Sequence, residues 1–242
     1  MKVIKISVVF LSLVLLSTSY SQISISLGPV VGYTSPSGDY SGTPQEYYNG
    51  TNYGLSGGIH FGAMARVKIP FLSGRLSVLY ASLSNDGSTG SGTGQTVEVK
   101  HKLLTIAIGP EFFFSLPAVP IRPYAGIDLL FTSFSGETIF QGTSAVPSGT
   151  SSMSSASRTG LGLGIGVNVG FGKKFSLDAG IKYNMHNLFG KEFKGGNNRI
   201  DSYTSLNDDK DPLFASGDDK HFIASDRSIS TIQFNLGFLF DF

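Results

Sequence analysis

The chain contains repeated stretches in which apolar and polar residues alternate. The last of them, "STIQFNLGFLFDF" (230–242), has an apolar side chain at every second position, with Leu239 as the one apolar residue on the other face. Side chains of a strand point alternately to its two faces, so this stretch predicts a strand between an apolar and a polar environment. Its apolar face carries Ile232, Phe234, Leu236, Phe238, Phe240 and Phe242.

Similar alternation predicts seven further strands and an all-β fold. The stretch that begins at Thr96 changes phase at Leu103 and Leu104, which indicates either a β-bulge or a rim where the strand leaves its apolar environment. In the stretch that begins at Arg75 the two faces are not cleanly separable. The seven stretches are 23–33, 53–69, 75–83, 96–114, 121–131, 159–172 and 175–185. An even number of strands fits a chain whose two ends lie on the same side.

The connections between these strands alternate between short and long. Short turns on one side and long polar loops on the other are typical of an eight-stranded antiparallel up-and-down transmembrane β-barrel, with periplasmic turns and extracellular loops. A soluble barrel or sandwich is the alternative that alternation alone leaves open. The short connections are 70–74, 115–120 and 172–174, and the long ones are 34–52, 86–95, 135–158 and 187–228.

The stretch "GLGLGIGVNVGFG" (160–172) indicates which face of the barrel points outward. Its apolar face carries Leu, Ile, Val and Phe, whereas its other face is almost entirely glycine. The interior of an eight-stranded barrel is just wide enough for side chains. Bulky residues therefore belong on the outside, against lipid, and a lipocalin-like soluble barrel would require the reverse.

The N-terminal residues 1–21 predict a cleaved secretory signal peptide. Lys2 and Lys5 precede an apolar run of about ten residues, which is too short for a spanning helix of roughly 20. Small residues at Ser19 and Ser21 suit cleavage before Gln22, so the barrel is expected to occupy 22–242. The chain has no Cys, which excludes disulfides and an acylated cysteine, and its formal net charge of +1 gives no reason to expect nucleic acid as a partner.

Charged residues lie on the polar faces of the predicted strands, which would make them lumen residues. Buried charges must be paired, because an isolated one is costly to desolvate. We expect ion pairs that close the lumen, with a gated pore or a proton path as the alternative. The candidates are Arg66, Glu111, Asp128, Asp178 and Lys182, with Lys68 and Arg122 on the same faces.

Catalytic and metal-binding patterns are weak. None of the four histidines, His60, His101, His186 and His221, is followed two residues later by Ser, as a lipid A deacylase would require. The acidic segment 207–218 lacks the central Gly and the closing Glu of an EF-hand loop. The sequence therefore predicts neither an enzyme nor a cofactor or metal site.

The long loops are the expected place of recognition, since loops on a rigid scaffold commonly carry binding residues. Tyr40, Tyr47 and Tyr48 are the recognition candidates in 34–52, although Tyr is also common in the aromatic girdle at a membrane surface. The segment 187–228 is far longer than an ordinary connection, which favours a docking or binding role.

The signal sequence ending "SYSQ", the strand "IRPYAGIDLLF" and the terminal "FNLGFLFDF" resemble the small outer-membrane β-barrel proteins of Bacteroidota. These are similar in architecture to the OmpA barrel and OmpX. The resemblance implies residence in the outer membrane, with lipid and lipopolysaccharide as surroundings. It also implies that Phe238, Phe240 and Phe242 form the signal that the barrel-assembly machinery reads.

Two classes of function follow. The first is a structural or interaction barrel, closed by its charges, that presents long extracellular loops. The second is an accessory subunit of an outer-membrane machine of the type IX secretion or barrel-assembly kind. A small solute channel, for which eight strands leave little room, and a lipid-modifying enzyme are weaker alternatives.

Overall fold

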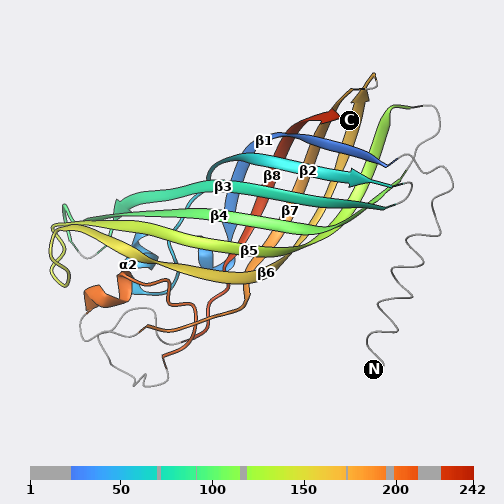
Figure 1. Ribbon diagram of the computed structural model, residues 1–242. Helices are drawn as coiled ribbons and strands as arrows, with labels where there is room; N and C mark the ends of the chain where they lie inside the picture. The colour runs from blue at the N-terminus through green and yellow to red at the C-terminus, as the bar shows by residue number, and fades with distance from the viewer. Residues whose placement is uncertain are drawn as a thin grey trace, which may run out of the picture.

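A computed structural model describes residues 23–69, 72–90, 92–114, 119–172, 174–194, 199–211 and 225–242. Each strand pairs antiparallel with the next, and the last pairs with the first, so the sheet closes on itself (Figure 1). The predicted eight-stranded up-and-down barrel is confirmed. The strands are β1 (Ser24–Ser37), β2 (Gly58–Lys68), β3 (Leu72–Ser88), β4 (Thr96–Phe113), β5 (Ile121–Gln141), β6 (Gly149–Phe171), β7 (Phe175–Phe189) and β8 (Ser230–Asp241).

The predicted signal peptide, residues 1–21, lies outside the described residues. Three short helices occur in the connections: the 3-10 helices η1 (Gly38–Tyr40) and η2 (Arg199–Tyr203), and the α-helix α2 (Pro44–Asn49). No helix in the described ranges is both long and apolar enough to cross a membrane.

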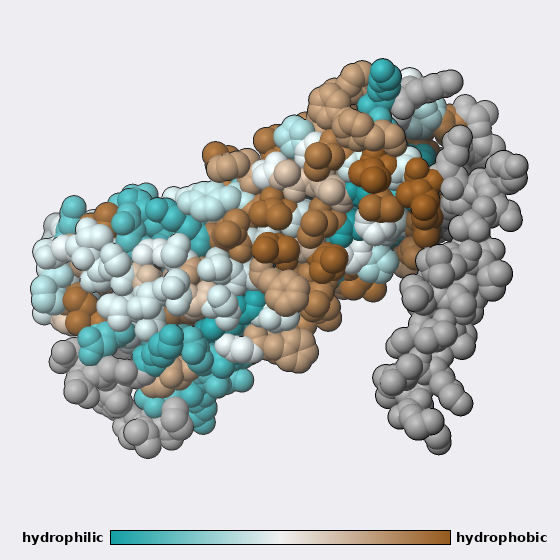
Figure 2. Space-filling model, viewed as in Figure 1, coloured by the Kyte–Doolittle hydropathy of each residue, from teal (hydrophilic) through white to brown (hydrophobic). Residues whose placement is uncertain are grey.

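The face of the barrel seen in Figure 2 carries a broad apolar belt that extends from the middle of the barrel to the end with the short connections. Along β6, Leu163 and Ile165 point outward and are exposed, whereas Gly160, Gly162 and Gly164 face inward and are buried. A Cβ on Gly164 would lie 3.0 Å from Cγ of Lys182, so glycine makes room for a long lumen side chain. The orientation predicted from side-chain volume is therefore correct.

Four neighbouring strands, β3 to β6, continue beyond the belt as a protruding sheet (Figure 1). Pairing of β3 with β4 runs to Ser88↔Thr96, and pairing of β5 with β6 runs to Phe140↔Gly149. The segment predicted as one long loop, 135–158, is therefore mostly strand, and 142–148 connects β5 to β6. The predicted loop 86–95 is likewise shortened, because β3 extends to Ser88.

The phase change at Leu103 and Leu104 is a rim and not a bulge. Pairing of β4 with β3 passes this point without a register shift, and Leu103 points inward while Leu104 points outward. Beyond it Lys100 and Lys102 face outward, while Val97 and Val99 face inward and are buried. The alternation is continuous, but the outer environment changes from lipid to water and the interior becomes apolar.

The seam between the first and last strands is fixed by polar contacts as well as by the ladder. β1 pairs with β8 from Ser26↔Asp241 to Ser37↔Ser230. Asp241 accepts a hydrogen bond from the hydroxyl of Ser26 and lies 2.7 Å from Nζ of Lys68 on β2. One carboxylate therefore ties three strands together at the end of the barrel where β1 begins and β8 ends.

Candidate functional site

A cluster of six buried charged side chains crosses the lumen near the end with the short connections. Arg66 donates through Nε and Nη2 to the carboxylate of Glu111, with Nη2 3.1 Å from Oε1, and the same Nη2 lies 3.0 Å from Oδ2 of Asp178. We call this group the lumen cluster. Its members are Arg66 on β2, Arg75 on β3, Glu111 on β4, Asp128 on β5, and Asp178 and Lys182 on β7.

Arg75 links the two halves of the lumen cluster. It donates through Nη1 to Glu111 and through Nη2 to Oδ2 of Asp128, 2.5 Å away. Nζ of Lys182 lies 2.6 Å from the same Asp128 oxygen. Three cations therefore face three carboxylates, and the formal charges of the cluster sum to zero.

Aromatic rings enclose this cluster. The Tyr124 hydroxyl donates to Oδ1 of Asp178 at 2.7 Å. The guanidinium carbon of Arg66 lies 5.1 Å from the centre of the Tyr124 ring and 5.2 Å from that of Phe113, which are cation–π distances. Charge pairing and ring contacts together hold the side chains across the bore.

The lumen beside the cluster holds almost no open volume. Leu239 packs with Val30, Met64 and Leu79 in a small apolar group, which accounts for the one apolar residue on the polar face of β8. A cavity lined by residues of both groups measures about 20 Å³. That is room for about one water molecule.

All five predicted lumen residues take part in this cluster, together with Arg75, which the sequence did not single out. Arg75 begins the stretch whose two faces could not be separated, so its inward direction carried no signal. Lys68 pairs with Asp241 at the seam, and Arg122 lies over the ring of Phe113 at 5.2 Å. These two candidates therefore lie outside the cluster.

The other half of the interior is filled by loops that fold back into the barrel. The β1–β2 loop contributes η1 and α2, and the β7–β8 loop contributes η2, and both lie against the inner face of the protruding sheet (Figure 1). We call this packed interior the loop plug. Its buried aromatic and larger aliphatic residues are Tyr40, Tyr47, Tyr48, Tyr53, Leu55, Leu83, Val97, Val99, Leu103, Phe134, Phe140, Val146, Tyr203, Leu206 and Ile229.

Helix α2 forms within the loop plug because its ends are well capped. The Thr43 hydroxyl accepts from the Glu46 amide, the Glu46 carboxylate accepts from the Thr43 amide, and Pro44 occupies the first turn. Gly50 ends the helix in the left-handed region with a φ of 79°. The cap directs Tyr47 and Tyr48 into the barrel.

The three tyrosines predicted for recognition lie inside the loop plug and not on the surface. Tyr40, Tyr47 and Tyr48 are 0%, 3% and 4% exposed. The Tyr40 hydroxyl lies 3.1 Å from Nδ1 of His101, and that of Tyr47 lies 2.7 Å from Oγ1 of Thr138. Although these residues belong to a loop, their large rings are stabilised by packing in the interior, so the side chains are unavailable to an outside partner. Burial also raises the pKa of Tyr47.

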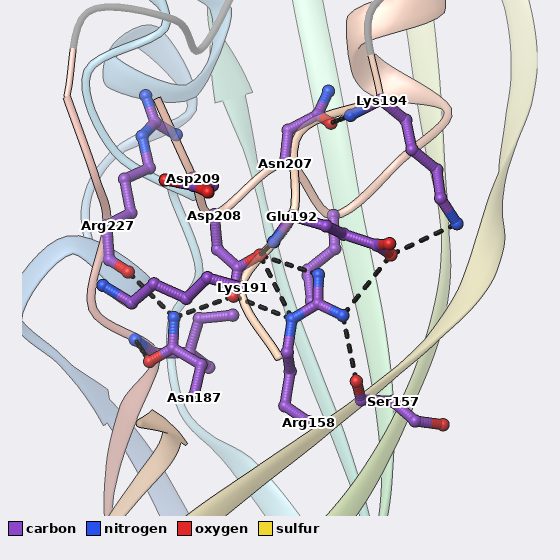
Figure 3. Close-up of polar contacts among 12 residues, drawn as sticks. Ser157, Arg158, Asn187, Lys191, Glu192, Lys194, Asn207, Asp208, Asp209 and Arg227 are labelled. Carbon is purple, nitrogen blue, oxygen red and sulfur yellow. Dashed lines mark hydrogen bonds and ion pairs between the residues drawn. The ribbon is translucent and has the colours of Figure 1, made fainter. Parts of the chain in front are cut away.

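An ion pair anchors the β7–β8 loop to the barrel wall (Figure 3). Arg158 on β6 donates from Nε to Oδ2 of Asp208 at 2.8 Å and from Nη2 to Oδ1 at 2.7 Å. Asn187 on β7 donates to the same carboxylate at 2.9 Å, and the Glu192 amide donates to it at 3.1 Å. Asp208, which is fully buried, therefore joins two strands and two parts of one loop.

Arg227 adds a second attachment on the other side of the loop plug. Its backbone amide donates to the Asp208 carbonyl at 3.0 Å, and its guanidinium lies 5.2 Å from the Tyr53 ring centre. The guanidinium also donates to the carbonyl of Gly50 at the end of α2. Burial lowers the pKa of Arg227 to about 10, which leaves it cationic at neutral pH.

The terminal phenylalanines face outward at the opposite end of the barrel. Phe238 and Phe240 lie on the outer face of β8, where both contact the ring of Phe175 on β7, and Phe242 is 80% exposed beyond the strand. They form the edge of the apolar belt next to the seam.

The histidines serve packing and hydrogen bonding in the interior. Nδ1 of His60 lies 2.9 Å from Oγ1 of Thr34, and His186 contacts the hydroxyls of Thr132 and Thr231 at 2.9 Å each. Within the described ranges, no group of three or more His, Asp or Glu residues is arranged to hold a metal ion. His221 and Asp218 lie outside those ranges.

Several solved structures of bacterial surface barrels are similar in outline. Neisserial surface protein A shares 17% identity, with 91% of this chain and 97% of that chain covered at a TM-score of 0.47. The N-terminal barrel of OprF from Pseudomonas aeruginosa shares 12%, with 92% and 100% covered at 0.44. Ail from Yersinia pestis, solved with the heparin analogue sucrose octasulfate, shares 12%, with 92% and 99% covered at 0.40.

Sequence comparison gives the assignment. No curated protein matches the chain. The family described as the outer membrane protein beta-barrel domain matches residues 8–240, nearly the whole length. The chain therefore belongs to the outer membrane protein beta-barrel family.

Proposed function

We propose that the protein is a closed structural barrel of the outer membrane that presents a rigid protruding sheet to the exterior. The observation that carries this proposal is the neutral lumen cluster, in which every charged member has an opposite charge within ion-pair distance. A solute channel would need these groups to separate, and a buried charge left without its partner destabilises a protein by about 3–5 kcal/mol.

The loop plug supports the same function, because it lies in series with the lumen cluster. A solute that passed the loops would still meet the six paired charges. These loops were expected to reach outward, but their aromatic side chains pack in the interior. Among the described residues, those that face the exterior include the outer face of β3 to β6, which carries Ser, Thr, Lys and Glu side chains beyond the apolar belt.

In this proposal, an N-terminal signal directs export and three phenylalanines at and just beyond the end of β8 direct assembly. Residues 1–21 act as a cleaved signal peptide, and the mature chain begins at Gln22. Phe238, Phe240 and Phe242 are read by the barrel-assembly machinery, for which their outward position at the last strand is suited. Outer-membrane lipid and lipopolysaccharide surround the finished barrel.

Mild-detergent extraction of outer membranes tests the proposed role. A structural barrel should be extracted as one species close to the size of the detergent-bound chain. Its intact mass should correspond to a chain that begins at Gln22. A stoichiometric large complex would instead show the accessory-subunit role, with the protruding sheet as the available contact surface. Recovery in the soluble periplasmic fraction would contradict both.

A further inference from the structure

A groove of about 300 Å³ lies on the outer wall where the apolar belt meets the polar, protruding part of the barrel. It runs across four neighbouring strands, β4 to β7. Its lining side chains include four large apolar residues and three small hydroxyl residues. The outward-facing ones are Leu104, Ile106, Phe131, Ser133, Ser157, Thr159 and Phe189.

Strand register explains why the wall is hollow here. One row of neighbours across the strands runs Leu104, Ser133, Ser157, and the next runs Ile106, Phe131, Thr159, Phe189. The small residues of the two rows, Ser133, Ser157 and Thr159, adjoin one another and lie beside large side chains, which leaves a hollow in the wall. The register of β6 against β7 shifts between Thr159 and Leu161, and Gly190 then turns the chain away with a φ of 84°.

A lysine lies directly above the groove. Lys102 is two residues from Leu104 on the same outward face of β4, on the side away from the short connections, and its neighbours across the strands are Ser82 and Ser135. Among the described residues, no carboxylate lies within ion-pair distance of Lys102. The next lysine along the strand, Lys100, is held by Glu98 and Glu137.

We propose that this groove holds one acyl chain of a phosphorylated lipid of the outer leaflet, with the phosphate against Lys102. The groove is continuous with the lipid-facing belt, so acyl chains are the apolar groups that reach it. The cation lies at the border of the belt, where headgroups begin, and the hydroxyls of Ser133 and Ser157 line the same border. This inference rests on the outer-membrane barrel proposed above.

Tryptophan fluorescence can test the site, because the chain contains no Trp. The reporter is Phe131→Trp in the groove, and the matched control is Phe61→Trp on β2, whose cross-strand neighbours are the uncharged Val31 and Tyr80. Each folded variant is placed in phosphatidylcholine vesicles with increasing fractions of dibrominated phosphatidic acid or dibrominated phosphatidylcholine. Bromine quenches Trp only on contact, so the two titrations give the relative affinity of the wall for the phosphate monoester lipid.

At position 131 we expect about a fivefold preference for phosphatidic acid over phosphatidylcholine, which is the effect of one lysine near the membrane surface. At position 61 we expect no preference. Lys102→Ala should abolish the preference, whereas Lys174→Ala, at the opposite end of the barrel, should leave it unchanged. The inference would be overturned if the preference for phosphatidic acid were the same at positions 131 and 61, or if the preference at 131 survived Lys102→Ala. Quenching at 61 but not at 131 would do so too, whereas quenching at neither position would contradict the membrane barrel itself.

Discussion

Glu111 holds together two arginines that would otherwise repel each other. Arg66 and Arg75 are direct neighbours across the β2–β3 pair, and both point into the lumen. Like charges opposite each other destabilise a sheet, and desolvation makes the repulsion stronger. The Glu111 carboxylate accepts from both guanidinium groups, so one side chain turns a repulsive pair into a bridge.

Replacing Glu111 with Ala should therefore strongly destabilise the barrel. We expect a loss of about 3–5 kcal/mol in the free energy of unfolding, since two buried cations lose their shared partner. Urea unfolding in detergent micelles measures this. The control is Glu98→Ala, which removes the exposed partner of Lys100 and should cost less than about 1 kcal/mol. Similar losses in the two variants would argue against the lumen cluster.

Gly28 on β1 allows a close approach of the two backbones at the seam. A Cβ there would lie 1.9 Å from the carbonyl oxygen of Phe238 on β8, which is backbone and cannot move aside independently. Gly28→Ala should reduce the fraction of heat-modifiable, closed barrel on a gel. Gly74→Ala should behave as the wild type, because nothing lies within 4 Å of its Cβ position. Normal closure of the Gly28 variant would contradict this seam geometry.

At the scale of elements, the sequence revealed the strands inside the belt but not their extensions. Within the belt the outer face is apolar and the inner face polar or glycine, so alternation is easily recognised. In the protruding sheet the contrast reverses: Val97 and Val99 point inward, while Glu98 and Lys100 point outward. Beyond Phe134 the outward residues of β5 and β6 are mainly polar, which made 135–158 resemble a loop.

The candidate site was predictable to a similar degree. Charges on a clear polar face identified the lumen residues, whereas Arg75 carried no such signal. The tyrosines were misleading because their burial depends on contacts between α2, η2 and β5, which are distant in the sequence. Tyr47, for example, meets Tyr203 and Thr138. No local pattern contains those contacts.

The described part of the β7–β8 loop is held to the barrel wall through Asp208. Asp208→Ala removes the partner of Arg158 and Asn187, so we expect segments 190–194 and 199–211 to exchange amide hydrogens at least tenfold faster, while the belt strands stay protected. Hydrogen exchange followed by mass spectrometry checks this. Asp209→Ala is the matched control, because the Asp209 carboxylate accepts from the amide of its own neighbour, Lys210. Unchanged exchange in the Asp208 variant would show that the loop is held otherwise.

At the scale of the whole molecule, assembly and stability can be separated through Phe242. Its side chain is exposed beyond β8, so deletion removes little packing, on the order of 1–3 kcal/mol, besides the two backbone hydrogen bonds between Phe242 and Ile25 on β1. We predict a sharp loss of heat-modifiable barrel in cells, together with normal folding in detergent micelles. Normal assembly in cells would refute the targeting role, and failure in micelles would make the role one of stability.

In the proposed function, closure of the whole molecule rests on two barriers in series, the loop plug and the lumen cluster. Releasing the loop through Asp208→Ala should therefore leave the bore shut, because the six paired charges and the small apolar group around Leu239 still fill it.

Single-channel recording in planar bilayers tests this central claim most directly. Both the wild type and Asp208→Ala should insert without producing steady conductance steps at voltages up to about 100 mV. At that voltage, one charge that crosses the whole membrane gains only about 2.3 kcal/mol, whereas a buried charge left without its partner costs about 3–5 kcal/mol. Large, stable open steps from the wild-type protein would contradict a closed barrel.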